Sequence, residues 1–229
     1  MPATTNGKFT LDLLRSHQVY KNAAGKRVPG VTTVQGIIEK PGLHKWFWQC
    51  GQDGIDPNKK RDEAAAIGTV AHARVEAFLR GMELDETGIA PDRLDKSANA
   101  FLSFMEWWKK EQFTVIESEL QMVSERWQVG GTLDILAARP SRNLVLVDVK
   151  TSNGIFNEAF TQSCAYSEMY EETHPGRHVD EIIIAHLPKD ESGECIPHPV
   201  KDAHRPLYVA AFVAANNAYH AWNSLPRVV

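Results

Sequence analysis

The sequence predicts an α/β (α+β) fold in which a small mixed β-sheet is flanked by helices. Two long segments with helical spacing of apolar residues come first. Three consecutive strand-like segments follow, and beyond them helices and strands are interspersed. The expected helices cover residues 62–80, 94–111, 156–173 and 203–223, and the expected strands cover 114–123, 127–137, 143–150, 178–187 and an edge segment at 195–200.

The first sixty residues are turn-rich and predict a helical and irregular N-terminal extension. Short strands are expected at 17–20 and 27–31, around a turn at 22–25. Thr32 or Thr33 suits the N-cap of a short helix that ends before Pro41, and residues 43–50 predict a second short helix.

Composition narrows the class of protein. No apolar stretch is long enough to span a bilayer, and the N-terminus lacks the pattern of a signal peptide, so a cytoplasmic location is expected. Cys50, Cys164 and Cys195 are too few and too far apart for a disulfide framework or a four-thiolate iron–sulfur cluster. The formal net charge of −4 argues against a protein that coats nucleic acid through bulk positive charge.

The strand at residues 144–150 carries the strongest functional signal. Because strand side chains alternate, Asp148 and Lys150 share a face with Leu144 and Leu146. Two opposite charges at the end of an apolar strand must be paired, hydrogen-bonded or bound to something. One interpretation is a strand-end ion pair, and the other is a metal-binding carboxylate beside an ammonium group that orients water or stabilises phosphate charge.

Asp134 strengthens the second interpretation. It ends the segment 129–134 on the preceding strand, after the paired glycines Gly130 and Gly131, which permit a bulge or a close backbone approach. Two carboxylates on neighbouring strands can converge on one Mg²⁺, which commonly takes one or two carboxylates. A turn or capping role for Asp134 is less consistent with the apolar run that continues after it.

Four blocks in order resemble the RecB-like branch of the PD-(D/E)XK nucleases, and the similarity spans roughly residues 18–170. Each block is weak alone, but the order and spacing are specific. Upstream, residues 28–34 and 43–46 are similar to phage-type and mitochondrial genome-maintenance exonucleases. The blocks are Gly68 to His72 with Glu76 (G-x-x-x-H), Glu119 leading to Gly130–Asp134 (E…G-x-x-D), Asp148 to Thr151 (D-x-K-T), and Gln162 to Tyr166 (Q-x-x-x-Y).

The resemblance implies a restriction-endonuclease-like core and a role for each matching residue. His72, Asp134, Asp148 and the backbone carbonyl of Val149 would be ligands of one or two Mg²⁺ or Mn²⁺ ions. Lys150 would position and activate the attacking water, and we expect partial burial to bring its pKa down toward neutrality. The remaining implied roles are support of the site or DNA contact for Gln162 and Tyr166, and support of the site or binding of a second metal for Glu76 and Glu119.

Helical spacing agrees with these roles. Gly68, His72 and Glu76 are one turn apart and face the same way, and Gly68 would let the helix approach the sheet closely. A lone helical histidine is more often a core residue, and the four-block order favours a ligand here. Two departures are the shortage of cysteines for a cluster and Gly30, where the family usually has serine.

The extension at 1–60 is expected to form part of a DNA-binding wall, with the nuclease core at 61–229 in one structural domain. Basic side chains concentrate in the first sixty-one residues, and with Trp46 and Trp48 nearby they suit a single strand or a free DNA end. A solvated surface with core tryptophans is the alternative. The candidate DNA-binding residues are Lys45, Trp46, Trp48, Lys59, Lys60, Arg61 and Thr151.

The function expected is a metal-dependent DNA exonuclease of phage or bacterial context, in recombination, replication or repair, working with a single-strand annealing or binding protein and no membrane. One alternative is a structure-specific or single-strand endonuclease of the same fold. Another is a non-catalytic nucleic-acid-binding relative. A zinc protein is a third alternative, and its candidate ligands are His174, His178, His186, His198 and Cys195.

Overall fold

The computed structural model describes residues 8–11, 19–189 and 193–226. The helices are α2 (Val31–Gln35), α3 (Pro41–Gln52), α4 (Pro57–Leu79), α5 (Pro91–Glu111), α6 (Asn157–Thr173), the 3-10 turn η1 (Asp202–His204) and α7 (Arg205–Asn223). The strands are β1 (Lys8–Phe9), β2 (Tyr20–Lys21), β3 (Arg27–Val28), β4 (Glu83–Leu84), β5 (Thr114–Ser124), β6 (Val129–Ala138), β7 (Leu144–Lys150), β8 (Glu181–His186) and β9 (Ile196–Pro199).

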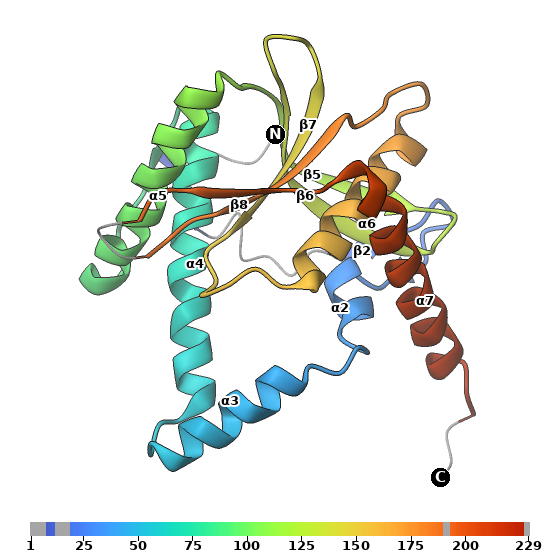
Figure 1. Cartoon of the computed structure of the whole chain (residues 1–229), viewed down its shortest axis with the longest axis horizontal. Coiled ribbons are helices and arrows are strands. Elements are labelled where there is room, and N and C mark those ends of the chain that lie inside the picture. The colour runs from blue at the N-terminus through green and yellow to red at the C-terminus, as the bar shows by residue number, and fades with distance from the viewer. Residues whose placement is uncertain (1–7, 12–18, 190–192, 227–229) are drawn as a thin grey trace.

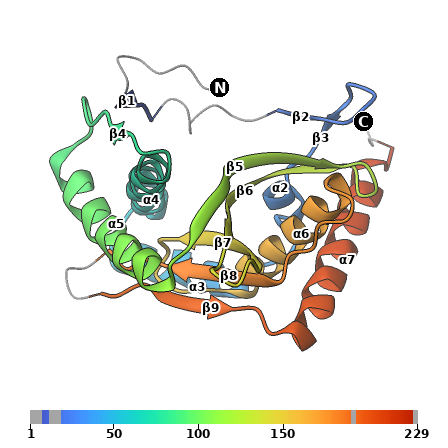
Figure 2. The same cartoon turned by 90° about the horizontal axis from the view of Figure 1, so that it is seen from above.

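A five-stranded mixed sheet in the order β5-β6-β7-β8-β9 forms the centre of the molecule. β7 and β8 run parallel, and the other neighbours are antiparallel. α4 and α5 cover one face, while α6, α7 and the short α2 cover the other (Figures 1 and 2). The predicted fold class, a small mixed sheet flanked by helices, is confirmed.

Each face of the sheet has its own buried core, because strand side chains alternate. Val145, Val147 and Val149 of β7 pack with α4 and α5. Leu144 and Leu146 point to the opposite face and pack with α6 and α7. Asp148 and Lys150 follow Leu146 in this alternation, as the sequence predicted.

Most element boundaries shift by a few residues from those expected. α4 begins at Pro57 rather than at 62, because the Asp56 side chain caps it by accepting from the backbone N–H groups of Asn58 and Lys59. The N-cap of α2 is Gly30 and not a threonine. α4 also runs through residue 60, where the extension was expected to end.

The N-terminal region forms two small pairings beside the central sheet. β2 and β3 make the expected hairpin, and residues 17 and 18 of the predicted strand lie outside the described residues. β1 pairs in parallel with β4, which the sequence did not predict because each strand is only two residues long. No helix in the described ranges is long and apolar enough to cross a bilayer.

Candidate metal centre and active site

His72 reaches the end of the central sheet because α4 lies very close to it. A Cβ added to Gly68 would lie 2.8 Å from the Thr151 Oγ1 atom, so a larger residue would push helix and strand apart. One turn later on the same helix, His72 Nδ1 lies 3.9 Å from Asp134 Oδ2. The close approach predicted from Gly68 is confirmed.

Asp134 lies where β6 separates from β7. The last backbone pair between these strands is Ile135 with Val147. Beyond it, the Val149 N–H has no partner on the β6 backbone and donates to Asp134 Oδ2 at 2.8 Å. The Asp134 side chain therefore accepts from a backbone N–H where the two strands separate, and this hydrogen bond holds the carboxylate at that end of the sheet.

Glu119 joins these two residues from β5. Ser118 pairs with Ile135 and Leu120 with Leu133, so Glu119 lies level with Asp134. Its backbone has a φ of 51°, which is uncommon for a residue other than glycine and re-aims the side chain. Ligand atoms of His72, Glu119 and Asp134 all lie within 4.8 Å of one another, the one such group among the described residues.

Asp148 and Lys150 lie beside this group and contact each other. Asp148 is buried, and Lys150 Nζ lies 2.7 Å from Asp148 Oδ2. Neither oxygen of Asp148 accepts a hydrogen bond of good geometry from the described residues, so the contact with Lys150 is chiefly coulombic. Asp148 is outside the group within 4.8 Å, and its role as a metal ligand stays a prediction.

The electrostatics of the site favour a bound cation. Burial, with the charges of Asp134 and Glu76, raises the pKa of Glu119 to about 8. Burial also raises the pKa of Asp148 to about 6, against the opposing charge of Lys150. Burial lowers the pKa of His72, which keeps its ring neutral and able to bind a metal. Crowded carboxylates, a neutral imidazole and buried carboxylate oxygens that accept no hydrogen bond form a donor set suited to a divalent ion.

The expectation that Lys150 has a lowered pKa is wrong. Burial alone lowers it, but the charges of Asp148 and Asp134 outweigh burial, and the pKa of Lys150 lies above its usual value. Beside these two carboxylates Lys150 is an ammonium group, suited to stabilising negative charge.

Gln162 and Tyr166 lie on α6 and contact each other. Gln162 Nε2 donates to Tyr166 Oη at 2.9 Å, as their one-turn spacing suggested. The Tyr166 ring packs on Gly131, where an added Cβ would lie 2.4 Å from its Cε1 atom. Tyr20 packs on Gly130 in the same way, and its hydroxyl lies 2.9 Å from Thr132 Oγ1. The paired glycines thus allow two aromatic rings to pack directly against β6.

Glu76 is committed to an ion pair. It is buried, accepts from Arg80 Nε, and also accepts from the Ser118 hydroxyl at 2.8 Å. Among the described residues it is not part of the group that could hold an ion. Of the roles expected for Glu76 and Glu119, this geometry suits support of the site for Glu76 and direct ligation for Glu119.

We expect Arg80→Met to destabilise the protein by about 2–4 kcal/mol, because it leaves the buried Glu76 carboxylate beside Glu119 without its counter-charge. Adding Glu76→Gln should restore most of the loss. Urea unfolding of the single and double variants measures both effects. Arg93→Met, which breaks the exposed pair with Glu63, is the matched control and should change little. An equal loss in the control would contradict the assignment.

An open cleft of about 520 Å³ exposes the candidate centre to solvent. Its walls include His72, Glu119, Val149, Lys150 and Thr151. The histidines and the cysteine considered for zinc form no comparable cluster in the described part of the chain. The site therefore combines a group of residues that could hold a metal ion, an ammonium group and an open cleft.

The candidate DNA-binding residues differ in their surroundings. Lys45, Lys59 and Lys60 are exposed, and the Trp48 side chain is 63% exposed, which excludes a core role for that tryptophan. Trp46 is partly buried and packs edge-on against Phe47. Arg61 pairs with Asp62 at 2.9 Å. Nucleic-acid binding by these residues stays a prediction.

The sequence reasoning missed two lysines at this end of the molecule, Lys96 and Lys189. Lys189 lines the cleft just beyond β8, which is parallel to β7. The carboxyl ends of parallel strands meet at one edge, but the residue in register with Lys150 is His186, and Lys189 follows three residues later without a signal of its own. Lys96 lies on α5, and no local pattern relates it to the site.

No family model and no curated protein matches this chain. Among solved structures, the protein named "putative exonuclease" from Eubacterium rectale is 11% identical with a TM-score of 0.41, covering 95% of this chain and 88% of its own. The protein SSO0001 is 12% identical with a TM-score of 0.36, covering 69% of this chain and 74% of its own. Neither similarity reaches a TM-score of 0.5, and no conclusion about function is drawn from them.

Proposed function

We propose that the chain is a divalent-metal-dependent DNA exonuclease of the PD-(D/E)XK class. One observation carries the proposal. A histidine, a glutamate and an aspartate from three different elements bring ligand atoms within 4.8 Å of one another at the mouth of a cleft, and Lys150 lies beside them. All four residues fall in the motif blocks that resemble RecB-like nucleases.

The chemistry follows from the donor set. A divalent ion held by these residues, Mg²⁺ or Mn²⁺, supplies Lewis-acid polarisation of a phosphodiester oxygen. His72, Glu119 and Asp134 would hold it, and Asp148 lies next to them with buried carboxylate oxygens that accept no hydrogen bond. The Lys150 ammonium group donates to the attacking water or to a phosphate oxygen, and stabilises the charge that develops there.

The rest of the site serves this chemistry. Asp134 is held by the Val149 N–H, so its carboxylate does not need to reorganise during reaction. Tyr166 and Gln162 pack behind the acids and keep that face of the site dry. Thr151, which follows β7 and lies against Gly68 of α4, contributes to the cleft wall.

Exonuclease action is favoured over endonuclease action by the N-terminal blocks at 28–34 and 43–46. A role in recombination, replication or repair beside a single-strand annealing or binding protein fits that activity. The alternative of a non-catalytic nucleic-acid-binding relative is disfavoured by the presence of both Asp148 and Lys150.

The deciding experiment is a time course on end-labelled linear DNA and covalently closed circular DNA, each single- and double-stranded. We expect release of label from linear DNA with Mg²⁺ or Mn²⁺, none with EDTA, and sparing of circles. Lys150→Met, which keeps the length of the side chain without its charge, should abolish cleavage.

The outcomes separate the alternatives. Cutting of circles would replace exonuclease with endonuclease activity. DNA binding without cleavage under any metal condition would favour the non-catalytic relative. Full activity of a folded Lys150→Met protein would rule out the assigned site.

A further inference from the structure

A second hollow of about 810 Å³ opens directly from the metal-site cleft. The two hollows share Ala64, Thr151, Ser152 and Lys189 along their common border. On α4 their walls run from His72 back toward Lys60, twelve residues or about 18 Å of helix at 1.5 Å per residue. The two hollows therefore form one continuous track, which we call the lysine groove where it leaves the cleft.

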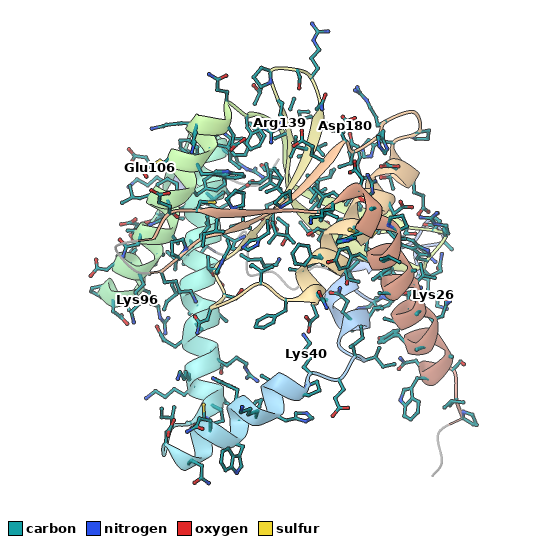
Figure 3. The ribbon with its side chains drawn as sticks, viewed as in Figure 1. Lys26, Lys40, Lys96, Glu106, Arg139 and Asp180 are labelled. Atoms are coloured by element: carbon teal, nitrogen blue, oxygen red, sulfur yellow. The ribbon has the colours of Figure 1, made fainter. Side chains whose placement is uncertain are left out.

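Four lysines line the lysine groove: Lys59, Lys60, Lys96 and Lys189. They belong to α4, to α5 and to the segment after β8, which are far apart in the sequence and lie together only in the folded chain. Figure 3 shows Lys96 at one end of α5, and Arg139 and Asp180 lie at the opposite end of the sheet. Ile55, Ile67 and Pro188 supply apolar surface between the charges.

The four groove lysines form no ion pair with the described residues, although the charge of Glu63 acts on Lys59 and Lys96. No carboxylate of the described residues lies within 4.0 Å of any of the four ammonium groups. Glu63 lines the groove, but it gives its two oxygens to Arg93 at 3.0 and 2.7 Å. The other acid, Asp56, caps α4. Burial and the nearby charge of Lys96 lower the pKa of Lys189, which indicates that these two ammonium groups lie near each other.

We propose that the lysine groove binds successive backbone phosphates of one nucleic-acid strand on one side of the bond that is cleaved, with Lys96 and Lys189 on the phosphates nearest the cleft. The proposal rests on the proposed nuclease function for its substrate class. A strand has charge at regular intervals along a line, and the groove has charge along a line that leads to the site. At the 3.4 Å rise of a B-form strand, about 18 Å accommodates about five nucleotides, and fewer if the strand is extended.

The first test measures binding rather than catalysis. A fluorescent single-stranded oligonucleotide is titrated in EDTA over a range of salt concentrations. For Lys96→Ala/Lys189→Ala we expect weaker binding and a salt slope that is shallower by about 1.4, since each lost contact to a single strand lowers it by about 0.7. The matched control is Lys109→Ala/Lys110→Ala, which removes two charges from the last turn of the same helix α5 and should bind as wild type.

The second test locates the contacted phosphates. Oligonucleotides with one neutral methylphosphonate linkage, moved stepwise along the strand, are compared on wild type and on the double variant. We expect one or two positions that weaken wild-type binding and have no further effect on Lys96→Ala/Lys189→Ala. Their side relative to the 5′ end reports the direction in which the strand lies. Lys96→Arg/Lys189→Arg should restore both the salt slope and the position-specific sensitivity.

Several results would overturn the proposal. These are an unchanged salt slope, an equal loss in the control, additive effects at every neutral linkage, or competition by polyglutamate as strong as by DNA. Binding in EDTA does not depend on cleavage. If wild type shows the predicted binding pattern but cleaves nothing, the groove proposal stands and the nuclease assignment is contradicted. If wild type cleaves DNA without showing the pattern, the nuclease assignment stands and the groove proposal is contradicted.

Discussion

Asp134→Asn is expected to lower DNA cleavage by about 10³-fold or more, because loss of several kcal/mol of charge stabilisation at a metal-assisted site corresponds to that factor. The asparagine keeps the size of the side chain, and its oxygen can still accept from the Val149 N–H. The variant therefore removes the charge of the candidate ligand without removing the contact that closes the sheet at this point.

A second readout separates a ligand from a structural residue. In the absence of metal, Asp134→Asn should be at least as stable as wild type, because one negative charge leaves a group in which Asp134 raises the pKa of both Glu119 and Asp148. With Mn²⁺ at a hundred times its Kd, wild type should gain about 2.7 kcal/mol of stability. The variant should lose most of that gain, measured as the shift in Tm.

The matched control is Asp180, which contacts the opposite end of β7. Asp180 Oδ2 accepts from the Leu144 N–H at 2.7 Å, the same kind of contact that Asp134 makes with Val149. Asp180 lies at the opposite end of the sheet from Lys96 (Figure 3). Asp180→Asn should retain activity and the metal-dependent rise in Tm. Wild-type metal response in Asp134→Asn would remove Asp134 from the centre.

Gly131→Ala is expected to destabilise the protein by about 3 kcal/mol, the upper part of the range for overpacking a well-filled core. The new Cβ would lie 2.4 Å from Tyr166 Cε1, and the Tyr166 ring is buried in the core on the α6 face. The ring has no free space to move into, so either β6 or α6 must shift. The free energy of unfolding in urea measures the change.

The penalty should depend on the tyrosine ring. In a Tyr166→Leu background, the added cost of Gly131→Ala should fall below about 1 kcal/mol, because the overlapping ring atoms are gone. Gly51→Ala is the control: nothing lies within 4 Å of a Cβ there, and the helical position should gain up to about 1 kcal/mol. An equal penalty in both tyrosine backgrounds would place the strain elsewhere.

Local patterns in the chain predicted much of this structure. Alternation in 144–150 assigned the valines to one face and Asp148 with Lys150 to the other, and the two separate cores agree. The helical spacing of Gly68, His72 and Glu76 predicted one face of α4 directed at the sheet. Such patterns depend only on the periods of helix and strand, which the sequence expresses directly. Boundaries were less accurate, as at α4, where the cap at Asp56 extends the helix.

The composition of the candidate centre could be predicted only in part. The sequence predicted His72 and Asp134 as metal ligands. For Glu119 it left two roles open, support of the site and binding of a second metal ion. Its place beside them depends on the positive φ at Glu119 and on the register that sets it level with Asp134. The lowered pKa expected for Lys150 was wrong, because the sequence does not show that two carboxylates lie close enough to outweigh burial.

By itself the sequence determined the order of the long helices and of the strands of the central sheet, the two faces of β7 and a set of candidate metal ligands. The tertiary structure decided which residues contact one another. It separates β6 from β7 at Asp134 and pairs Glu76 with Arg80. It also brings lysines from α4, α5 and the segment after β8 together along one groove. The physical reason is that faces follow from repeat periods within a segment. Contacts between segments that are far apart in the sequence depend instead on strand twist, register and helix packing, which no single segment encodes.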